Sequence, residues 1–339
     1  MAPSLPAAEL AAVFVGCVLY GIYLVTLGIA LRVIFTTKSG RKHRSEINWI
    51  VVAVSAILFV NSTLDLAVVF NTIVEAFLYT GPGGSEHVFK NGSGWETFVK
   101  SFCVGVQTLT GDAILIYRCW YIWSKSWRIV GLPMVLWLGT LGCEIGILSY
   151  LPRLGVGQIN SGVIVPWGLA FWSLTISTNI ITTSLIVWRI WGAQRKTKKY
   201  RSSPDFLPNQ PESTLTRAMR NIVESGMIYT AASILELAAF ATQSTLNYPA
   251  SALAFHSVGI TFNLIIIRGA ANRSEESLEE TQVHFSETPG ASRNRRSAAS
   301  RTHDKADVFV LSGLQKDSDG ATLAPNFEEF ATTRTGSAK

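Results

Sequence analysis

Four ionisable side chains lie within long apolar stretches of this sequence, where their chemistry could support binding or proton transfer. Asp65, Glu144 and Glu236 are carboxylic acids, and His256 carries an imidazole, which titrates near neutral pH. An ionisable group is costly in an apolar environment, so it is normally paired within the protein or directed toward a ligand, an ion or water. These four residues are therefore the candidates for a ligand- or ion-binding site.

The same side chains permit two other interpretations. Hydrogen bonds that orient packed helices use similar residues, and carboxylic acids in a desolvated pocket can act as general acids. No Asp-rich metal motif, HExxH motif, phosphate-binding loop or nucleophile elbow occurs in the sequence. The sequence therefore identifies no catalytic residue, no metal ligand and no cofactor.

Asp112 and Arg118 form a second pair of candidates, as a switch or an anchor at one end of an apolar stretch. They are six positions apart, so their side chains do not share a helical face and a direct ion pair is not expected. Asp112 is expected to reach a neighbouring helix, where Asn179, Thr182 or Asn263 would be a suitable partner. Arg118 is expected either to extend to lipid phosphates or to act as a switch.

Seven apolar stretches must position these residues. The chain has 339 residues, of which 48% are hydrophobic and only 15% are charged, below the quarter that is typical of soluble domains. About 20 apolar residues cross a ~30 Å hydrocarbon core as an α-helix. We therefore predict an all-α bundle of seven transmembrane helices over residues 1–267, with 97–123 as its axis. The predicted spans cover residues 10–31, 47–78, 97–123, 129–151, 163–191, 221–245 and 249–267.

The distribution of basic residues predicts the orientation of this bundle. Sixteen Lys and Arg residues lie in the loops after spans one, three and five or at the span ends beside these loops, whereas the opposite loops contain only Lys90 and Arg153, with Lys100 at a helix end. Because basic residues concentrate on the cytosolic side, the N-terminus is predicted to be outside and the C-terminus in the cytosol. Tryptophans near the span ends are expected to form belts at the membrane interfaces. These are Trp49, Trp120, Trp123, Trp127, Trp188 and Trp191 at the inner side, and Trp95 and Trp167 at the outer side.

Two segments outside the spans also carry predictions. The Gly-rich loop between spans two and three contains the sequon Asn91-Gly92-Ser93, which is a glycosylation site if the loop is lumenal. Residues 268–339 are polar and rich in Ser, Thr, Arg and Glu, and they are predicted to form a disordered cytosolic tail.

The most distinctive motif is GDAILIYRCWYIW at residues 111–123. It resembles the signature of a large group of seven-span integral membrane proteins in mushroom-forming (basidiomycete) fungi. The resemblance covers roughly residues 10–270 and implies the topology without implying an activity. A looser similarity is to G-protein-coupled receptors, with an aromatic–arginine pair at the inner end of span three. The chain departs from that pattern, because Tyr117 precedes Arg118 where an acid would stand and no extracellular-loop cysteine can pair with Cys103.

These patterns favour a receptor-like sensor of an extracellular ligand, with a cytosolic signalling partner at the basic inner loops and the tail. The alternatives are a membrane-embedded, terpene-cyclase-like enzyme of secondary metabolism and a small-molecule or proton-coupled transporter. The net charge of +6 does not indicate a nucleic-acid partner, because the basic residues flank the spans and match a lipid bilayer. The plasma membrane is favoured over internal membranes.

Overall fold

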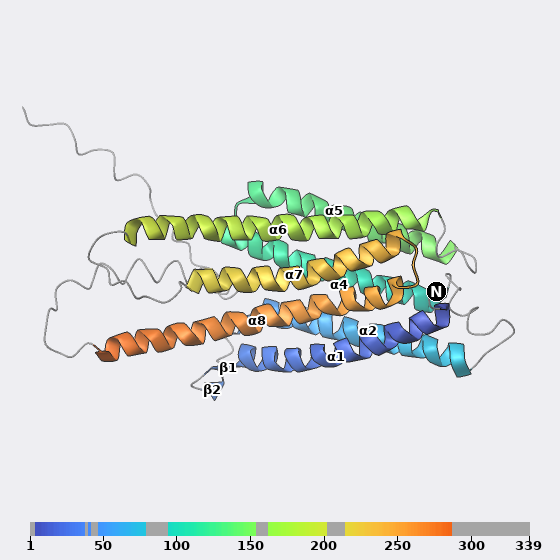
Figure 1. Ribbon diagram of the computed structural model, residues 1–339, viewed down its shortest axis with the longest axis horizontal. Helices are drawn as coiled ribbons and strands as arrows, with labels where there is room; N and C mark the ends of the chain where they lie inside the picture. Colours follow the sequence, from blue (N-terminus) through green and yellow to red (C-terminus); the bar gives the residue numbers. More distant parts are fainter. Residues whose placement is uncertain are drawn as a thin grey trace, which may run out of the picture.

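Over the residues that it describes, the computed structural model is a bundle of seven long α-helices. The described residues are 4–37, 40–41, 47–78, 94–153, 162–201 and 214–286. The helices run along one common direction (Figure 1). They are α1 (Leu5–Phe35), α2 (Trp49–Leu78), α4 (Trp95–Ile122), α5 (Trp127–Tyr150), α6 (Ile164–Arg201), α7 (Thr214–Ala241) and α8 (Asn247–Ser286). A 3-10 turn, η2 (Leu151–Arg153), follows α5, and a small hairpin of β1 (Thr36–Thr37) and β2 (Gly40–Arg41) follows α1.

Each of the seven helices contains a segment long and apolar enough to cross a membrane, which makes the chain a multi-pass membrane protein. The helix bounds agree with the predicted spans to within a few residues at most ends. Helix α1 starts earlier than predicted, at Leu5, because a proline in its first turn is compatible with a helix N-terminus. Helices α6 and α8 continue past their apolar segments, which end at Gly192 and Ala271.

The extension of α8 corrects one prediction. Residues 268–286 were expected to be disordered, but they are the last part of a continuous helix that ends at Ser286. Glu, Ala and Arg, which favour helices, make up eight of the 19 residues in this polar segment, so the helix continues without a sustained apolar pattern in its sequence. The rest of the predicted tail, 287–339, lies outside the described residues.

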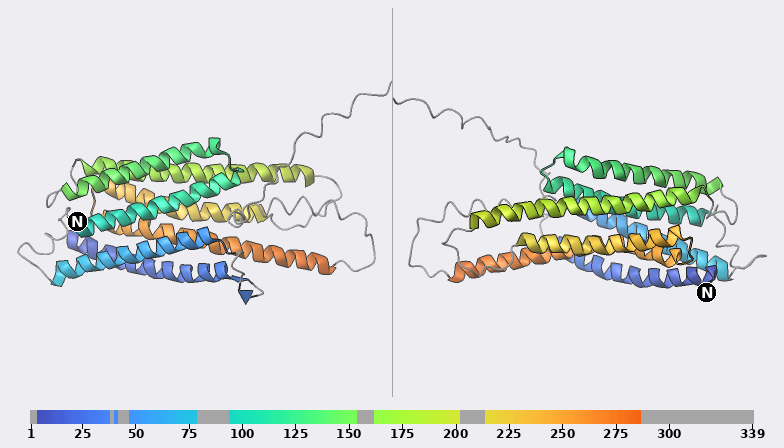
Figure 2. Two further views of the ribbon diagram at one scale, coloured as in Figure 1. Left: turned by 180° about the vertical axis from the view of Figure 1, so that it is seen from behind. Right: turned by 45° about the horizontal axis from the view of Figure 1, so that its top comes forward.

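Two helices occupy the centre of the bundle. Helix α4 packs against α2, α5, α6 and α8, as expected for the predicted axis. Helix α8 packs against α1, α2, α4 and α7, and 56% of its apolar segment is buried compared with 33% for α4. The two views in Figure 2 show both helices between the outer ones. The prediction of a single axis is therefore incomplete, because α8 shares this position.

Small residues allow the central helices to approach their neighbours. A Cβ at Gly259 of α8 would lie 2.6 Å from Cε2 of Tyr23 on α1, and the Tyr23 side chain is only 1% exposed. A Cβ at Gly111 of α4 would lie 2.6 Å from Cγ1 of Val258 on α8. Both distances are far shorter than ordinary van der Waals contacts. The glycines are therefore required for these two close helix–helix contacts.

The tryptophans divide into an outward and an inward group. Trp49, Trp95 and Trp127 are highly exposed on the helix surfaces, as an interfacial belt requires. Trp120 and Trp123 instead pack among residues of α4, α5 and α6, and the Trp123 indole N–H donates to the Leu185 carbonyl oxygen at 3.2 Å. These two partly buried residues lie at the predicted inner end of the third span, where they also stabilise helix packing.

Candidate functional site

Charged and aromatic side chains from five helices meet around Lys100 of α4, at the end of the bundle where α1 begins. The Lys100 Nζ atom lies 3.7 Å from Oε2 of Glu9 on α1 and 5.9 Å from the ring centre of Tyr248 on α8. Lys100 also lies within electrostatic range of Asp65 on α2 and Glu236 on α7. We refer to these five residues as the Lys100 cluster. Lys100 therefore contacts α1 and α8 directly, and it faces the acids of α2 and α7 without forming an ion pair with them in the described part of the chain.

The position of Asp65 in this cluster follows from hydrogen bonds one turn away. Asn61 of α2 donates from Nδ2 to the Cys103 carbonyl oxygen at 2.8 Å and to Gln107 Oε1 at 2.9 Å. Gln107 in turn donates from Nε2 to Ser62 Oγ at 3.3 Å. Residues four positions apart lie on the same helical face. These bonds, which set the register of α2 against α4, therefore also direct Asp65 toward α4.

Glu144 and Glu236 are buried acids in the same half of the bundle. Glu144 of α5 lies against α4 at Gly105, where a Cβ would be only 2.4 Å from the Glu144 Cδ atom. Its Oε1 atom and the Oε2 atom of Glu236 have no hydrogen-bond partner among the described residues. Buried carboxyl oxygens are nearly always hydrogen-bonded, to protein, water or ligand. These two oxygens are therefore available to bind a ligand group or water.

His256 lies apart from the acids. It is buried on α8 with its Nε2 atom next to Gly16 of α1, 3.8 Å from where a Cβ would lie. Its ring packs near the rings of Tyr20 and Phe255, with centroids 6.1 and 5.1 Å away. Within the described segments it forms no ion pair with a carboxylate. The space over Gly16 accommodates the imidazole ring against α1.

The polar interior continues from the Lys100 cluster toward the opposite end of the bundle. Both carboxylate oxygens of Asp112 on α4 are buried without a hydrogen-bond partner in the described part of the chain. The same holds for the amide group of Asn179 and the hydroxyl groups of Thr175 and Thr182, all on α6. Tyr229 of α7 lies within electrostatic range of Asp112. A set of unpaired polar groups therefore lines the contact region of α4, α6 and α7.

The predicted partners of Asp112 do not bond to it. Asn263 turns toward α1 and donates from Nδ2 to Thr26 Oγ1 at 3.2 Å, because the close approach of α1 and α8 brings Thr26 within reach. Asn179 and Thr182 lie in the same polar interior without reaching the carboxylate. Among the described residues, neither oxygen of Asp112 has a hydrogen-bond partner. The side chains of Asp112 and Arg118 leave α4 in different directions, as their six-residue spacing requires.

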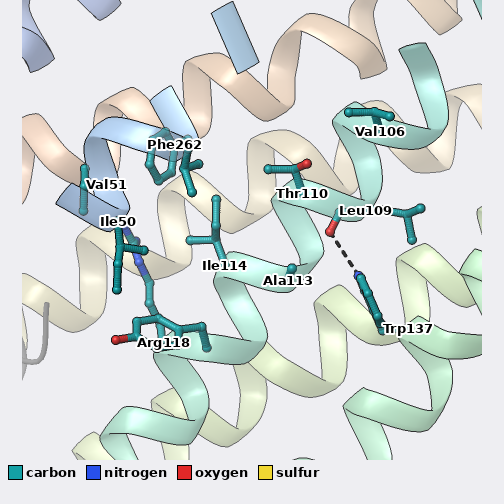
Figure 3. A pocket seen from close by; sticks show the side chains of 12 residues that line it. Ile50, Val51, Val106, Leu109, Thr110, Ala113, Ile114, Arg118, Trp137 and Phe262 are labelled. Carbon is teal, nitrogen blue, oxygen red and sulfur yellow. Dashed lines mark hydrogen bonds between the residues drawn. The ribbon is translucent and has the colours of Figure 1, made fainter. Parts of the chain in front are cut away.

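Arg118 lies toward the other end of α4, beside a pocket of about 410 Å³ (Figure 3). The pocket is bounded by α2, α4 and α5, and by Phe262 of α8. The Arg118 guanidinium carbon lies 5.9 Å from the centre of the Phe262 ring. No carboxylate in the described segments pairs with this guanidinium group. Arg118 is thus a partly buried cation without an anionic partner in the part of the chain that the structure describes.

Three members of the Lys100 cluster, Glu9, Lys100 and Tyr248, were not among the candidates from the sequence analysis. Glu9 precedes the predicted first span, and Lys100 was interpreted only as a residue near a helix end. A signal was present, since the two residues have opposite charges and lie at the same predicted end of spans one and three. The pairing of Glu9 with Lys100 depends on where α1 begins, because Glu9 is part of the helix only if the helix starts before residue 9. Helix α1 starts at Leu5.

The remaining features add little to the site. Asn91 lies outside the described residues, and all four cysteines are free. Within the described ranges, no three His, Cys, Asp or Glu residues are grouped so that they could hold a metal ion.

No protein-family model and no curated protein sequence matches the chain. The arguments for function therefore come from the geometry of the bundle.

Proposed function

We propose that this multi-pass membrane protein is a receptor-like sensor and that its ligand binds the Lys100 cluster. The observation that supports this proposal is that Lys100 contacts a carboxylate of α1 and an aromatic ring of α8 and lies within electrostatic range of acids on α2 and α7. A ligand that replaces one of these contacts binds some helix arrangements more tightly than others. Such differential binding is what shifts a population between conformations.

The composition of the cluster favours a ligand with a cationic or hydrogen-bond-donating group. The three carboxyl groups of Glu9, Asp65 and Glu236 outnumber the single ammonium group of Lys100. Tyr248 adds an aromatic face, which attracts cations. A small amine is therefore the best chemical match, with its charged group among the carboxyl groups.

The two central helices provide the route to the opposite end of the bundle. Lys100 is on α4 and Tyr248 is on α8, and both helices continue to the end that is predicted to be cytosolic. At that end α6 carries the basic residues Arg189 and Arg195, whose guanidinium groups lie over Trp123 and Trp191. We place the cytosolic signalling partner at this basic end.

Ligand-dependent thermal stability tests the binding site. Purified protein in lipid nanodiscs is heated with small amines, carboxylic acids and neutral alcohols of matched size. The amines are expected to raise the unfolding temperature of the wild type, and Asp65→Asn or Glu236→Gln should reduce that shift. Glu224→Gln is the matched control, because Glu224 is an exposed acid at the opposite end of the apolar segment of α7, which spans Val223–Ala241. An equal shift by all three compound classes, or an undiminished shift in both cluster variants, refutes the proposal.

A distance measurement tests whether binding is transmitted. Spin labels at Arg195→Cys and Ala271→Cys, both at exposed positions, report the separation of α6 and α8 in a Cys17→Ser background. The other three cysteines are buried and need no replacement. A stabilising amine should change the distance distribution in the wild-type cluster but not with Glu236→Gln. An unchanged distribution with saturating amine argues against a sensor.

The unpaired polar groups between α4, α6 and α7 favour a second candidate function, a proton-coupled carrier. They extend the polar interior from Glu236 to Thr182, which is the kind of path that a transported ion or proton requires. Uptake by reconstituted vesicles in a proton gradient tests this candidate. A carrier should lose coupling with Glu236→Gln, whereas a sensor shows no uptake in either form.

Glycosylation tests the proposed orientation. If the N-terminus is outside, Asn91 lies in a lumenal loop, and an endoglycosidase should increase the electrophoretic mobility of the expressed protein. Asn91→Gln should abolish this change. Surface biotinylation of the same cells distinguishes the proposed plasma-membrane location from an internal membrane.

A further inference from the structure

The pocket beside Arg118 is a groove on the outer surface of the bundle. Its floor is one face of α4, formed by Val106, Thr110, Ala113 and Tyr117, which follow each other at helical spacing. All four are only partly buried, although α4 is a central helix. Helices α2 and α5 form the walls, and α4 lies between them in Figure 2. The groove therefore faces the hydrocarbon region of the membrane.

The walls of the groove have a defined shape. Trp137 of α5 is held by a hydrogen bond from its indole N–H to the Leu109 carbonyl oxygen at 3.0 Å, drawn in Figure 3. Ile50 and Val54 of α2 contribute branched aliphatic side chains on the other side. The side chain of Ala113 is small and leaves the middle of the floor open. The lining suits a flexible hydrocarbon chain.

The length of the groove matches one leaflet of a bilayer. Val106 and Arg118 are twelve residues apart, which is about 18 Å along a helix. One leaflet contributes about half of the ~30 Å hydrocarbon core. The groove therefore extends from about the middle of the membrane to the interface at which Arg118 lies. An acyl chain in this groove would bring its headgroup to the guanidinium group.

Charge identifies the headgroup. Arg118 is partly buried and has no carboxylate partner in the described segments, and a guanidinium group binds phosphate oxygens in a bidentate manner. Basic pockets between transmembrane helices on the cytosolic side are suited to acidic lipid headgroups. We propose that this groove binds one anionic glycerophospholipid, with an acyl chain along α4 and the phosphate at Arg118.

Native mass spectrometry of the detergent-purified protein tests this proposal. The protein is titrated with phosphatidylserine, with phosphatidylcholine of the same acyl chains, and with inorganic phosphate. The wild type should retain one phosphatidylserine molecule in preference to phosphatidylcholine, and inorganic phosphate should not compete. Arg118→Gln should lower this retention by about fivefold or more, as expected for the loss of one basic contact. Arg128→Gln is the matched control, because Arg128 is exposed at the same end and does not line the groove.

A second variant tests the acyl-chain contact independently. Ala113→Leu fills the floor of the groove while keeping Arg118, and it should also reduce phosphatidylserine retention. Thermal unfolding shows that each variant is folded before its lipid retention is compared. Equal retention of both lipids by the wild type, an equal loss with Arg128→Gln, or competition by inorganic phosphate overturns the proposal. Preferential retention of a sterol or of a cytosolic peptide in the groove also overturns it.

Discussion

Replacing Gly259 with alanine should destabilise the bundle, whereas the same replacement at Gly28 should not. Gly259 faces Tyr23, and an added Cβ would lie 2.6 Å from Cε2 and 2.8 Å from Cδ2 of its ring. The ring is rigid and only 1% exposed, so it cannot move aside without displacing α1 or its own packing partners. Gly28 lies on the exposed face of α1, and nothing lies within 4 Å of its added Cβ.

The comparison of the two variants isolates the cost of the clash. Both replacements remove a glycine from a helix interior, which favours the helix by up to about 1 kcal/mol in each case. Overpacking a well-packed site costs about 1–3 kcal/mol. The propensity gain cancels in the difference, so Gly259→Ala should be less stable than Gly28→Ala by about 1–3 kcal/mol. For a protein of this size, each kcal/mol corresponds to about 2–4 °C in unfolding temperature.

The buried cysteines provide the assay. Cys103, Cys119 and Cys143 are free and buried, so a thiol-reactive fluorescent probe reports their exposure as the bundle unfolds on heating. Cys17 is exposed and is replaced by serine to remove its background signal. The unfolding temperature of each glycine variant is then compared with that of the parent protein in the same detergent.

Equal unfolding temperatures of the two variants would refute the reasoning. That result would mean that α1 and α8 separate at little cost, and that Gly259 is not a constraint on their packing. Stabilisation of the protein by both replacements would also mean that the added Cβ at Gly259 is accommodated without cost. A loss of stability at Gly28 alone would contradict its assignment to the exposed face of α1.

Three further predictions concern hydrogen bonds, thiols and a surface ion pair. Asn61→Ala and Gln107→Ala should each destabilise the protein, with a coupling of about 0.6–1.7 kcal/mol in a double-mutant cycle of thermal unfolding, because the two amides bond across α2 and α4. Cys17 should react with a thiol probe in the folded protein, whereas the other three cysteines should react only after unfolding, as mass spectrometry would show. Arg268→Ala should change the stability by less than about 1 kcal/mol despite its 2.8 Å contact with Glu224, because both side chains are substantially exposed.

The helices could be predicted from the sequence because their signal is local. An apolar stretch of about 20 residues is sufficient to identify a span, and the bounds of α2 and α5 differ from the prediction by at most two residues. The end of α8 was not predicted, because hydropathy detects where an apolar segment ends and not where a helix ends. Helix-favouring polar residues carry α8 on to Ser286.

The candidate site was only partly predictable, because it depends on contacts between helices. The burial of Asp112, Glu144 and Glu236 follows from their apolar surroundings in sequence, and the structure places all three inside the bundle. The partners of these acids depend on helix rotation and depth, which a single sequence does not specify. Lys100 therefore pairs with Glu9 although it was not a candidate site residue, and His256 lies beside Gly16 of α1, apart from the acids.

The continuity of α8 makes this helix a mechanical lever. Its 40 residues correspond to about 60 Å of unbroken helix, from Tyr248 in the Lys100 cluster to Ser286. A tilt of about 5° around the Tyr248 end moves the far end by about 5 Å, the height of one helical turn. A small tilt of α8 at the Lys100 cluster thus produces a displacement at its far end that is large enough to change which residues contact a neighbouring helix. In the proposed sensor, the end of α8 farthest from the ligand is therefore the part that moves most when the ligand binds.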